Sequence, residues 1–284
     1  MTVLLAVIVG FLAGRLVWVL SRPVFSGAVF ARQNYRGRQV ATGVGLVLSV
    51  SVMTVEAARL VTAAATGGGP DVGTDIGGPR LGMLVLVVGL AVVGLTDDLA
   101  GDAGERGFRG HLRALAQGRL TTGGLKLLGG GAVALLAVAA TRPDNDFGFL
   151  LADAALVALA ANLGNLFDRA PGRTIKVAAL LLVVAAAATA ADRRLAGAAV
   201  VVGAGLALLA EDLRERVMLG DTGANVLGGA LGLAVVATAS PVGRLGVLGV
   251  LAILNGVSEW VSFSRVIDAV APLRALDRAG RRTT

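Results

Sequence analysis

Long apolar stretches alternate with short polar segments along the whole chain. We interpret these stretches as membrane-spanning helices, because a span needs about 17–25 predominantly apolar residues. The nine candidates cover residues 2–20, 41–63, 80–96, 123–140, 148–167, 175–190, 195–210, 222–240 and 243–261. The pattern predicts an all-α, polytopic membrane helix bundle in which residues 1–284 form a single domain.

The positions of the basic residues predict how this bundle is oriented. Of the 26 lysines and arginines, 18 lie in or beside the tail and the segments after the first, third, fifth and seventh spans, whereas 5 lie in or beside the other connections. Basic residues concentrate in cytoplasmic loops. We therefore expect the N-terminus outside and the C-terminus in the cytoplasm. The glycine-rich segment 66–79, with Asp71 and Asp75, then lies on the outer side, where both carboxylates are solvated.

Composition supports the membrane class and limits the chemistry. Charged residues make up 16% of the chain, against about 25% in soluble domains. There is no cysteine and one histidine, His111, so carboxylate oxygens are left as metal ligands, and these suit Mg²⁺, Mn²⁺ or Ca²⁺. The net charge of +7 is spread over short loops. We therefore expect a plasma-membrane protein whose partners are lipid phosphates or a phosphorylated substrate, and no nucleic acid.

Two adjacent acids, Asp97 and Asp98, end the third predicted span. Carboxylates at this end of a helix oppose its dipole, so a simple cap would more naturally be basic. Adjacent side chains diverge around a helix, which lets one acid face the bundle interior and the other the loop. The alternative is a solvated helix end without further function.

A second polar segment ends the fifth predicted span. Asn162, Asn165 and Asp168 recur every three residues and so lie on one slowly drifting helical stripe. Polar groups at membrane depth should face protein or a wet cavity. Arg169 and Arg173 follow and are suited to phosphate. The alternative is that the amides only join neighbouring helices by hydrogen bonds.

Two further residues fall on the same predicted cytoplasmic side. Asp221, followed by Thr222, enters the eighth span, and either caps this helix or holds a cation that bridges to phosphate. Lys126 begins the fourth span, and either extends to the interface or pairs with the acids or a diphosphate. Together the four segments predict Mg²⁺-assisted phosphate chemistry at a membrane surface.

These segments resemble motifs of the polyprenyl-phosphate N-acetylhexosamine-1-phosphate transferases. That superfamily includes phospho-N-acetylmuramoyl-pentapeptide transferase and the enzymes that load N-acetylglucosamine phosphate onto a lipid carrier. The matching segments, in chain order, are VVGLTDDLAG, LKLLGG, NLGNLFDRAPG and MLGDTGANVLGGALG. In addition, NYRGRQVATGVGLVL, residues 34–48, resembles the family's first cytoplasmic segment.

The resemblance implies a ten-helix fold and a Mg²⁺-dependent reaction, with Mn²⁺ as the alternative ion. A polyprenyl phosphate attacks the sugar-linked phosphate of a UDP-sugar, UMP leaves, and a lipid-linked diphosphate sugar forms for cell-envelope glycan synthesis. The implied catalytic residues are Asp97, Asp98, Lys126 and Asp168, the implied metal ligand is Asp221, and the implied substrate-binding residues are Thr42, Asn162, Asn165 and Arg169.

The chain departs from the family pattern at three places. The second motif commonly reads Asp-Gly-x-Asp-Gly, whereas Pro171 stands here at the second acid. The first segment commonly reads Pro-Thr-x-Gly-Gly, whereas residues 41–45 read ATGVG. The last cytoplasmic loop often has a histidine cluster, whereas Arg274 begins the matching positions here. We hypothesise that Arg274, supported by Arg278, takes over donor recognition, because arginine grips diphosphate bidentately; contact with anionic lipid is the alternative.

Two other functions remain open. A homologue that has lost catalysis would bind lipid phosphate or a membrane partner without turnover, and Pro171 and the missing histidines favour it. A transporter would need internal repeats and charges near the bilayer midplane, but the acids lie at helix ends. A homodimer is an open alternative to a monomer.

Overall fold

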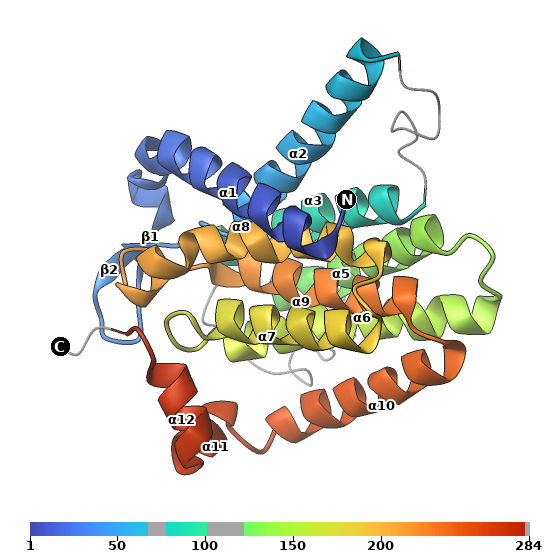
Figure 1. Ribbon diagram of the computed structural model, residues 1–284. Helices are drawn as coiled ribbons and strands as arrows, with labels where there is room; N and C mark the ends of the chain where they lie inside the picture. Colours follow the sequence, from blue (N-terminus) through green and yellow to red (C-terminus); the bar gives the residue numbers. More distant parts are fainter. Residues whose placement is uncertain (68–77, 101–121, 282–284) are drawn as a thin grey trace.

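The computed structural model describes residues 1–67, 78–100 and 122–281. Within these residues the chain forms eleven α-helices, two short 3₁₀ turns and a two-stranded sheet (Figure 1). The elements are α1 Val3–Phe25, η1 Ala28–Phe30, β1 Ala31–Gln33, β2 Gln39–Ala41, α2 Leu46–Ala65, α3 Pro79–Ala100, α5 Thr122–Thr141, α6 Phe147–Phe167, α7 Arg173–Ala188, η3 Arg193–Leu195, α8 Ala196–Leu213, α9 Gly220–Thr238, α10 Pro241–Ser258, α11 Phe263–Ala269 and α12 Ala271–Arg278.

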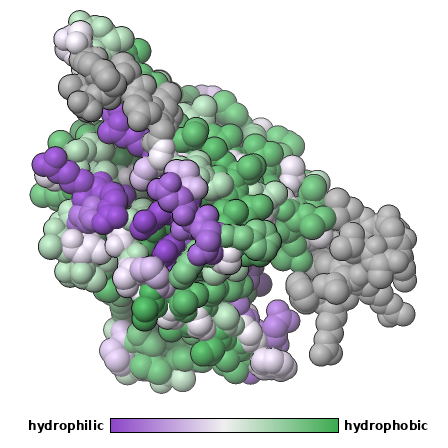
Figure 2. All heavy atoms as spheres, turned by 90° about the vertical axis from the view of Figure 1, so that its right-hand side faces the viewer, coloured by the Kyte–Doolittle hydropathy of each residue, from purple (hydrophilic) through white to green (hydrophobic). Residues whose placement is uncertain are grey.

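The prediction of an all-α helix bundle is confirmed. A helix lies over each of the nine predicted spans, and in the described ranges seven helices are long and apolar enough to cross a membrane. The remaining two of the nine helices, α7 with 16 residues and α9, are not among these seven. Figure 2 shows the end of the bundle at the right of Figure 1, where a group of hydrophilic side chains is flanked by hydrophobic surface. Asp71, Asp75 and His111 lie outside the described residues.

Helix α9 is the buried centre of the bundle, with 13 of its 19 residues buried. Gly228 and Gly232, which the sequence presents as a small-xxx-small pair, lie against α6. A Cβ added at Gly232 would lie 2.8 Å from the Cβ of Ala160. Small residues thus let the two helix backbones approach closely.

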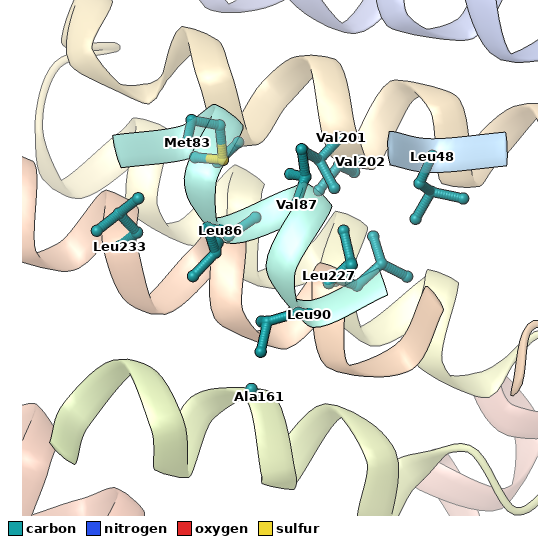
Figure 3. Packing of buried hydrophobic residues seen from close by; sticks show 14 of the residues in the cluster. Leu48, Met83, Leu86, Val87, Leu90, Ala161, Val201, Val202, Leu227 and Leu233 are labelled. Carbon is teal, nitrogen blue, oxygen red and sulfur yellow. The ribbon is translucent and has the colours of Figure 1, made fainter. Parts of the chain in front are cut away.

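Close packing at small residues also joins α1 to α8. A Cβ added at Gly14 would lie 2.8 Å from the Cα of Ala204. Helix α3 contributes larger side chains to the core, where Met83, Leu86 and Leu90 are buried between α8 and α9 (Figure 3). This packing brings the ends of α3, α6 and α8 and the starts of α5, α7 and α9 to one end of the bundle, the end that carries the β-hairpin (Figure 1).

The hairpin and the last two helices have no counterpart in the predicted spans. Strands β1 and β2 are three residues long and pair antiparallel, with Ala31 opposite Ala41. Ala41 also forms a parallel bridge to Val217, just before α9. Helices α11 and α12 have seven and eight residues. Elements this short are invisible to a search for apolar runs of spanning length.

Candidate active site

The polar segments predicted from the sequence meet at the end of the bundle that carries the hairpin. Lys126 of α5 pairs with Asp221 at the start of α9, and its Nζ lies 3.5 Å from Oδ2 of Asp97 at the end of α3. All three side chains keep about a quarter or less of their surface exposed. An ammonium group therefore lies between two carboxylates that come from different helices.

Asn165 of α6 completes this cluster. In the amide orientation that satisfies both neighbours, its nitrogen donates to Asp221 Oδ1 at 2.6 Å and its oxygen accepts from Lys126 Nζ at 2.7 Å. We use the name "rim cluster" for Asp97, Lys126, Asn165 and Asp221. Four helices, α3, α5, α6 and α9, each supply one member.

Asp98 faces the start of α9 rather than Lys126. Its Oδ1 accepts a hydrogen bond from the backbone N–H of Asp221 at 3.0 Å, and its Oδ2 accepts one from the N–H of Thr222 at 3.0 Å. A carboxylate at this position satisfies free N–H groups and is attracted by the positive end of the helix dipole. Gly220 has φ +70, and a Cβ there would lie 2.8 Å from Asp98 Oδ1, so glycine is needed at this position. Asp98 thus positions the start of α9, which carries Asp221, while its implied catalytic role stays a prediction.

Asp168 follows α6 and lies beside the cluster. Its Oδ1 accepts a hydrogen bond from Thr174 Oγ1 at 3.1 Å. Burial raises the pKa of Asp168 well above its ordinary value of 3.8, and repulsion from Asp212 and then Asp221 raises it further. A proton on this carboxyl group is therefore favoured beyond the acidic range in which a free aspartic acid holds one.

A cavity of about 230 Å³ adjoins Asp168. It lies between the tip of the hairpin, the α6–α7 turn and the segment before α9. Its polar lining includes Asn34, Tyr35, Arg169 and Asp212. The cavity thus offers hydrogen-bond donors and acceptors and one aromatic ring beside Asp168.

Asp212 was missed in the sequence. It is buried at the end of α8, and its Oδ2 accepts a hydrogen bond from the N–H of Gly172 at 2.7 Å. Glu211 and Asp212 are two adjacent acids at the end of an apolar helix, as are Asp97 and Asp98. The predicted span ended at residue 210, which left both acids in a connecting segment.

Thr42 belongs to the segment that packs against the site. It is buried, and its N–H donates to the carbonyl of Phe30 at 2.8 Å. The following Gly43 has φ +69, and its Cβ position lies 3.8 Å from Asp98 Oδ2. Gly45 donates its N–H to the carbonyl of Leu219 at 3.0 Å. Residues 41–45 therefore support the loop into α9 beside Asp98.

Asn162 and Arg274 point elsewhere. Asn162 Nδ2 donates to Asn255 Oδ1 of α10 at 2.7 Å, which agrees with the alternative of a hydrogen bond between helices. Arg274 donates to the carbonyl of Asp268 at 2.7 Å, within the tail itself. A role of Arg274 in donor recognition stays a prediction.

The tail is nevertheless fixed to the site end of the bundle. Asp277 of α12 accepts a bidentate pair of hydrogen bonds from Arg173 at 2.8 and 3.0 Å. Arg281 adds a third contact to Asp277 at 2.5 Å and donates to the carbonyl of Pro171 at 3.1 Å. One buried acid that the sequence analysis did not single out thus holds the tail against the start of α7 and the α6–α7 turn.

The donor set of the rim cluster fits Mg²⁺. In the part of the chain that the structure describes, no group of three or more acidic, histidine or cysteine side chains surrounds one point. Mg²⁺ commonly uses one or two protein carboxylates together with water and substrate phosphates. Asp97 and Asp221 provide two carboxylates around a position of positive charge, which the Lys126 ammonium group occupies.

No protein-family model matches the chain, and no curated protein matches its sequence. The geometry and charge of the rim cluster, Asp168 and the adjoining cavity therefore carry the functional proposal.

Proposed function

We propose that the chain is a membrane enzyme that transfers a sugar-1-phosphate, of N-acetylhexosamine type, from a UDP-sugar to a polyprenyl phosphate. The observation that carries the proposal is the meeting of Asp97, Lys126 and Asp221 from three helices. An ammonium group held between two carboxylates is suited to a diphosphate that arrives with Mg²⁺. The ammonium group of Lys126 would donate hydrogen bonds to the diphosphate, and the carboxylate of Asp221 would hold the metal.

In the proposed reaction, an oxygen of the lipid phosphate attacks the sugar-linked phosphorus of the donor. The bond from this phosphorus to the bridging oxygen breaks, and the bridging oxygen leaves with UMP. In this reaction Asp97, which lies beside Lys126, would take up the proton of the lipid phosphate. Lys126 donates to the diphosphate as negative charge develops on UMP. When bound, Mg²⁺ neutralises further charge on the diphosphate.

The nucleotide of the donor is proposed to occupy the 230 Å³ cavity. Arg169 can contact phosphate, and Tyr35 offers an aromatic face to a base. The carboxyl of Asp168 lines this cavity, and desolvation and neighbouring acids raise its pKa. The lipid phosphate would then approach from the bilayer side of the rim cluster.

The proposed topology has nine spans in the plasma membrane, the N-terminus outside, and the rim cluster on the cytoplasmic face. It is supported by the concentration of basic residues at the end of the bundle that carries the cluster. Reporter fusions after residue 284 and within 66–79 should report opposite sides. Signals from the same side would contradict this topology.

Turnover is tested with purified protein, Mg²⁺, undecaprenyl phosphate and a panel of UDP-sugars, with UMP release as the readout. Lys126→Met and Asp97→Asn should lower the rate by about a hundred- to a thousand-fold, because each removes a group that acts on developing charge. Asp192→Asn is the matched control, since it removes a carboxylate near the opposite end of α8. Absence of UMP with every sugar would overturn the proposal.

A lipid-phosphate-binding protein without turnover is the second candidate. Pro171, at the position of the family's second acid, favours it. In that case undecaprenyl phosphate should bind saturably while no UDP-sugar yields UMP. Transport into vesicles without UMP release would instead support a transporter.

A further inference from the structure

A cluster of basic side chains lies around Glu211 near the end of α8. Three arginines surround Glu211 of α8: Arg22 at 3.1 Å, Arg216 at 3.0 Å and Arg15 at 3.5 Å. The Glu211 side chain is 7% exposed, whereas those of the arginines are 46–56% exposed. One carboxylate balances one guanidinium group, so this set keeps two positive charges that face outward.

A cavity of about 440 Å³ adjoins two of these arginines, Arg22 and Arg216. Arg22, Arg216 and Gln39 supply hydrogen-bond donors to it, and Trp18 supplies an apolar wall. The Arg22 guanidinium group lies 5.3 Å from the centre of the Trp18 ring, which holds it in place at the cavity wall. The volume falls within the range of about 300–1,000 Å³ that is usual for small-molecule sites.

The cavity is lined by Trp18, Arg22 and Phe25 of α1, a helix that is long and apolar enough to cross a membrane. Arg15 lies ten residues before the end of α1, which corresponds to about 15 Å along the helix. A charged side chain at that depth is costly unless it has a partner. On the same helix Leu16 is 56% exposed and Leu20 is 70% exposed. A basic pocket therefore continues into an apolar helix surface.

We propose that this cavity binds the phosphate headgroup of an anionic phospholipid, whose acyl chains lie along α1. A phosphate group matches the excess of guanidinium donors, and the exposed leucines match the chains. This site is separate from the rim cluster, which comes from α3, α5, α6 and α9. It does not depend on the proposed transferase reaction.

Trp18 makes the proposal directly testable. The chain has two tryptophans, Trp18 and Trp260, so Trp260→Phe leaves Trp18 as the single fluorescent reporter. This protein, in detergent micelles, is titrated with brominated phosphatidylglycerol and, separately, with brominated phosphatidylcholine. We expect quenching of Trp18 at clearly lower concentrations of phosphatidylglycerol. Equal quenching by both lipids would overturn the proposal.

Variants identify the groups that bind. Arg216→Gln removes a half-exposed side chain and should weaken phosphatidylglycerol binding about five-fold, the usual value of one basic residue at a membrane surface. Adding Arg22→Gln should remove the preference over phosphatidylcholine. Arg193→Gln is the matched control near the far end of α8 and should bind like the parent. An unchanged preference in Arg216→Gln and in the double variant would contradict the assignment.

A free phosphate ion is distinguished in the same assay. If the lipid is the ligand, millimolar inorganic phosphate should leave quenching by brominated phosphatidylglycerol unchanged. Displacement of the lipid by inorganic phosphate at such concentrations would show a soluble-anion site and overturn the lipid proposal. Folding of each variant is checked by gel filtration in detergent.

Discussion

The carboxylate of Asp98 and the side chain of Thr222 are joined at the meeting of two helices. Asp98 Oδ2 lies 2.5 Å from the Thr222 hydroxyl oxygen and 3.0 Å from its backbone nitrogen. A side chain of α3 thus caps α9, while its sequence neighbour Asp97 lies near Lys126. Two adjacent acids have different environments, because successive side chains diverge around a helix.

Asp98→Ala should lower stability, whereas Asp97→Ala should not. The first change leaves two N–H groups at the start of α9 without their acceptor, which costs about 1–3 kcal/mol. The measurement is the thermal unfolding midpoint of each variant in the same detergent. Equal shifts for the two variants would refute the division of tasks.

Asp221→Asn should weaken the Mg²⁺ dependence of UDP-sugar binding. An amide has no charge to offer a divalent cation, and Mg²⁺ prefers carboxylate oxygens. Affinity is measured by calorimetry at several Mg²⁺ concentrations, with Asp192→Asn as the control. A metal dependence equal to that of the parent would show that Asp221 is not a metal ligand.

Arg169→Gln should reduce UDP-sugar affinity about ten- to a hundred-fold. Arg169 lines the cavity beside Asp168, and a charged hydrogen bond to phosphate is worth about 1.5–3 kcal/mol. Arg274→Ala is the parallel test of the hypothesis drawn from the tail. If Arg274→Ala inserts correctly and binds UDP-sugar with unchanged affinity, contact with anionic lipid is the remaining interpretation of Arg274. If Arg274→Ala lowers UDP-sugar affinity and Arg169→Gln does not, the donor site lies nearer to α12 than proposed.

The tail should detach from α7 in acid. Burial alone raises the pKa of Asp277, but hydrogen bonds from Arg173 and the charges of Arg173 and Arg281 outweigh it and hold the pKa below 3.8. Because the folded-state pKa is the lower one, this carboxylate stabilises docking at neutral pH, and the stabilisation is lost from about pH 4 downward.

Spin labels on α7 and α12 measure this docking, through cysteines introduced into a chain that has none. Their separation should increase on acidification, and Asp277→Asn should increase it already at pH 7. Asp268→Asn, which removes a half-exposed acid of α11, should behave like the parent. A separation that does not change with pH would argue against this ion pair as the tether.

Removal of one partner from the buried pair of Asp153 and Arg244 should destabilise the bundle. These side chains are 1% and 6% exposed and join α6 to α10. Arg244→Met leaves a buried carboxylate unpaired, which costs about 3–5 kcal/mol. The double change Asp153→Leu with Arg244→Met should recover most of the loss in unfolding midpoint. No recovery would indicate that packing, rather than charge, decides the effect.

The sequence by itself determined the helix content and the positions of nine helices. Apolar runs of spanning length report directly on helices, because a lipid-facing backbone must satisfy its own hydrogen bonds. The runs also placed Asp97, Lys126, Asn165 and Asp221 at helix ends, and the alternation of helix direction implied that these ends share one side of the bundle. Short elements such as the hairpin and α12 carry no such signal.

Only the tertiary structure decided which of these polar side chains meet. Helical spacing puts Asn162 and Asn165 on one stripe, but the stripe drifts enough that Asn162 bonds to Asn255 while Asn165 reaches Asp221. The partner of each group depends on which helix packs beside it, and that choice rests on backbone contacts at small residues such as Gly228. Contacts between residues far apart in the chain, such as Arg173 with Asp277, leave no periodic pattern in the sequence. They therefore become visible only when the helices are packed.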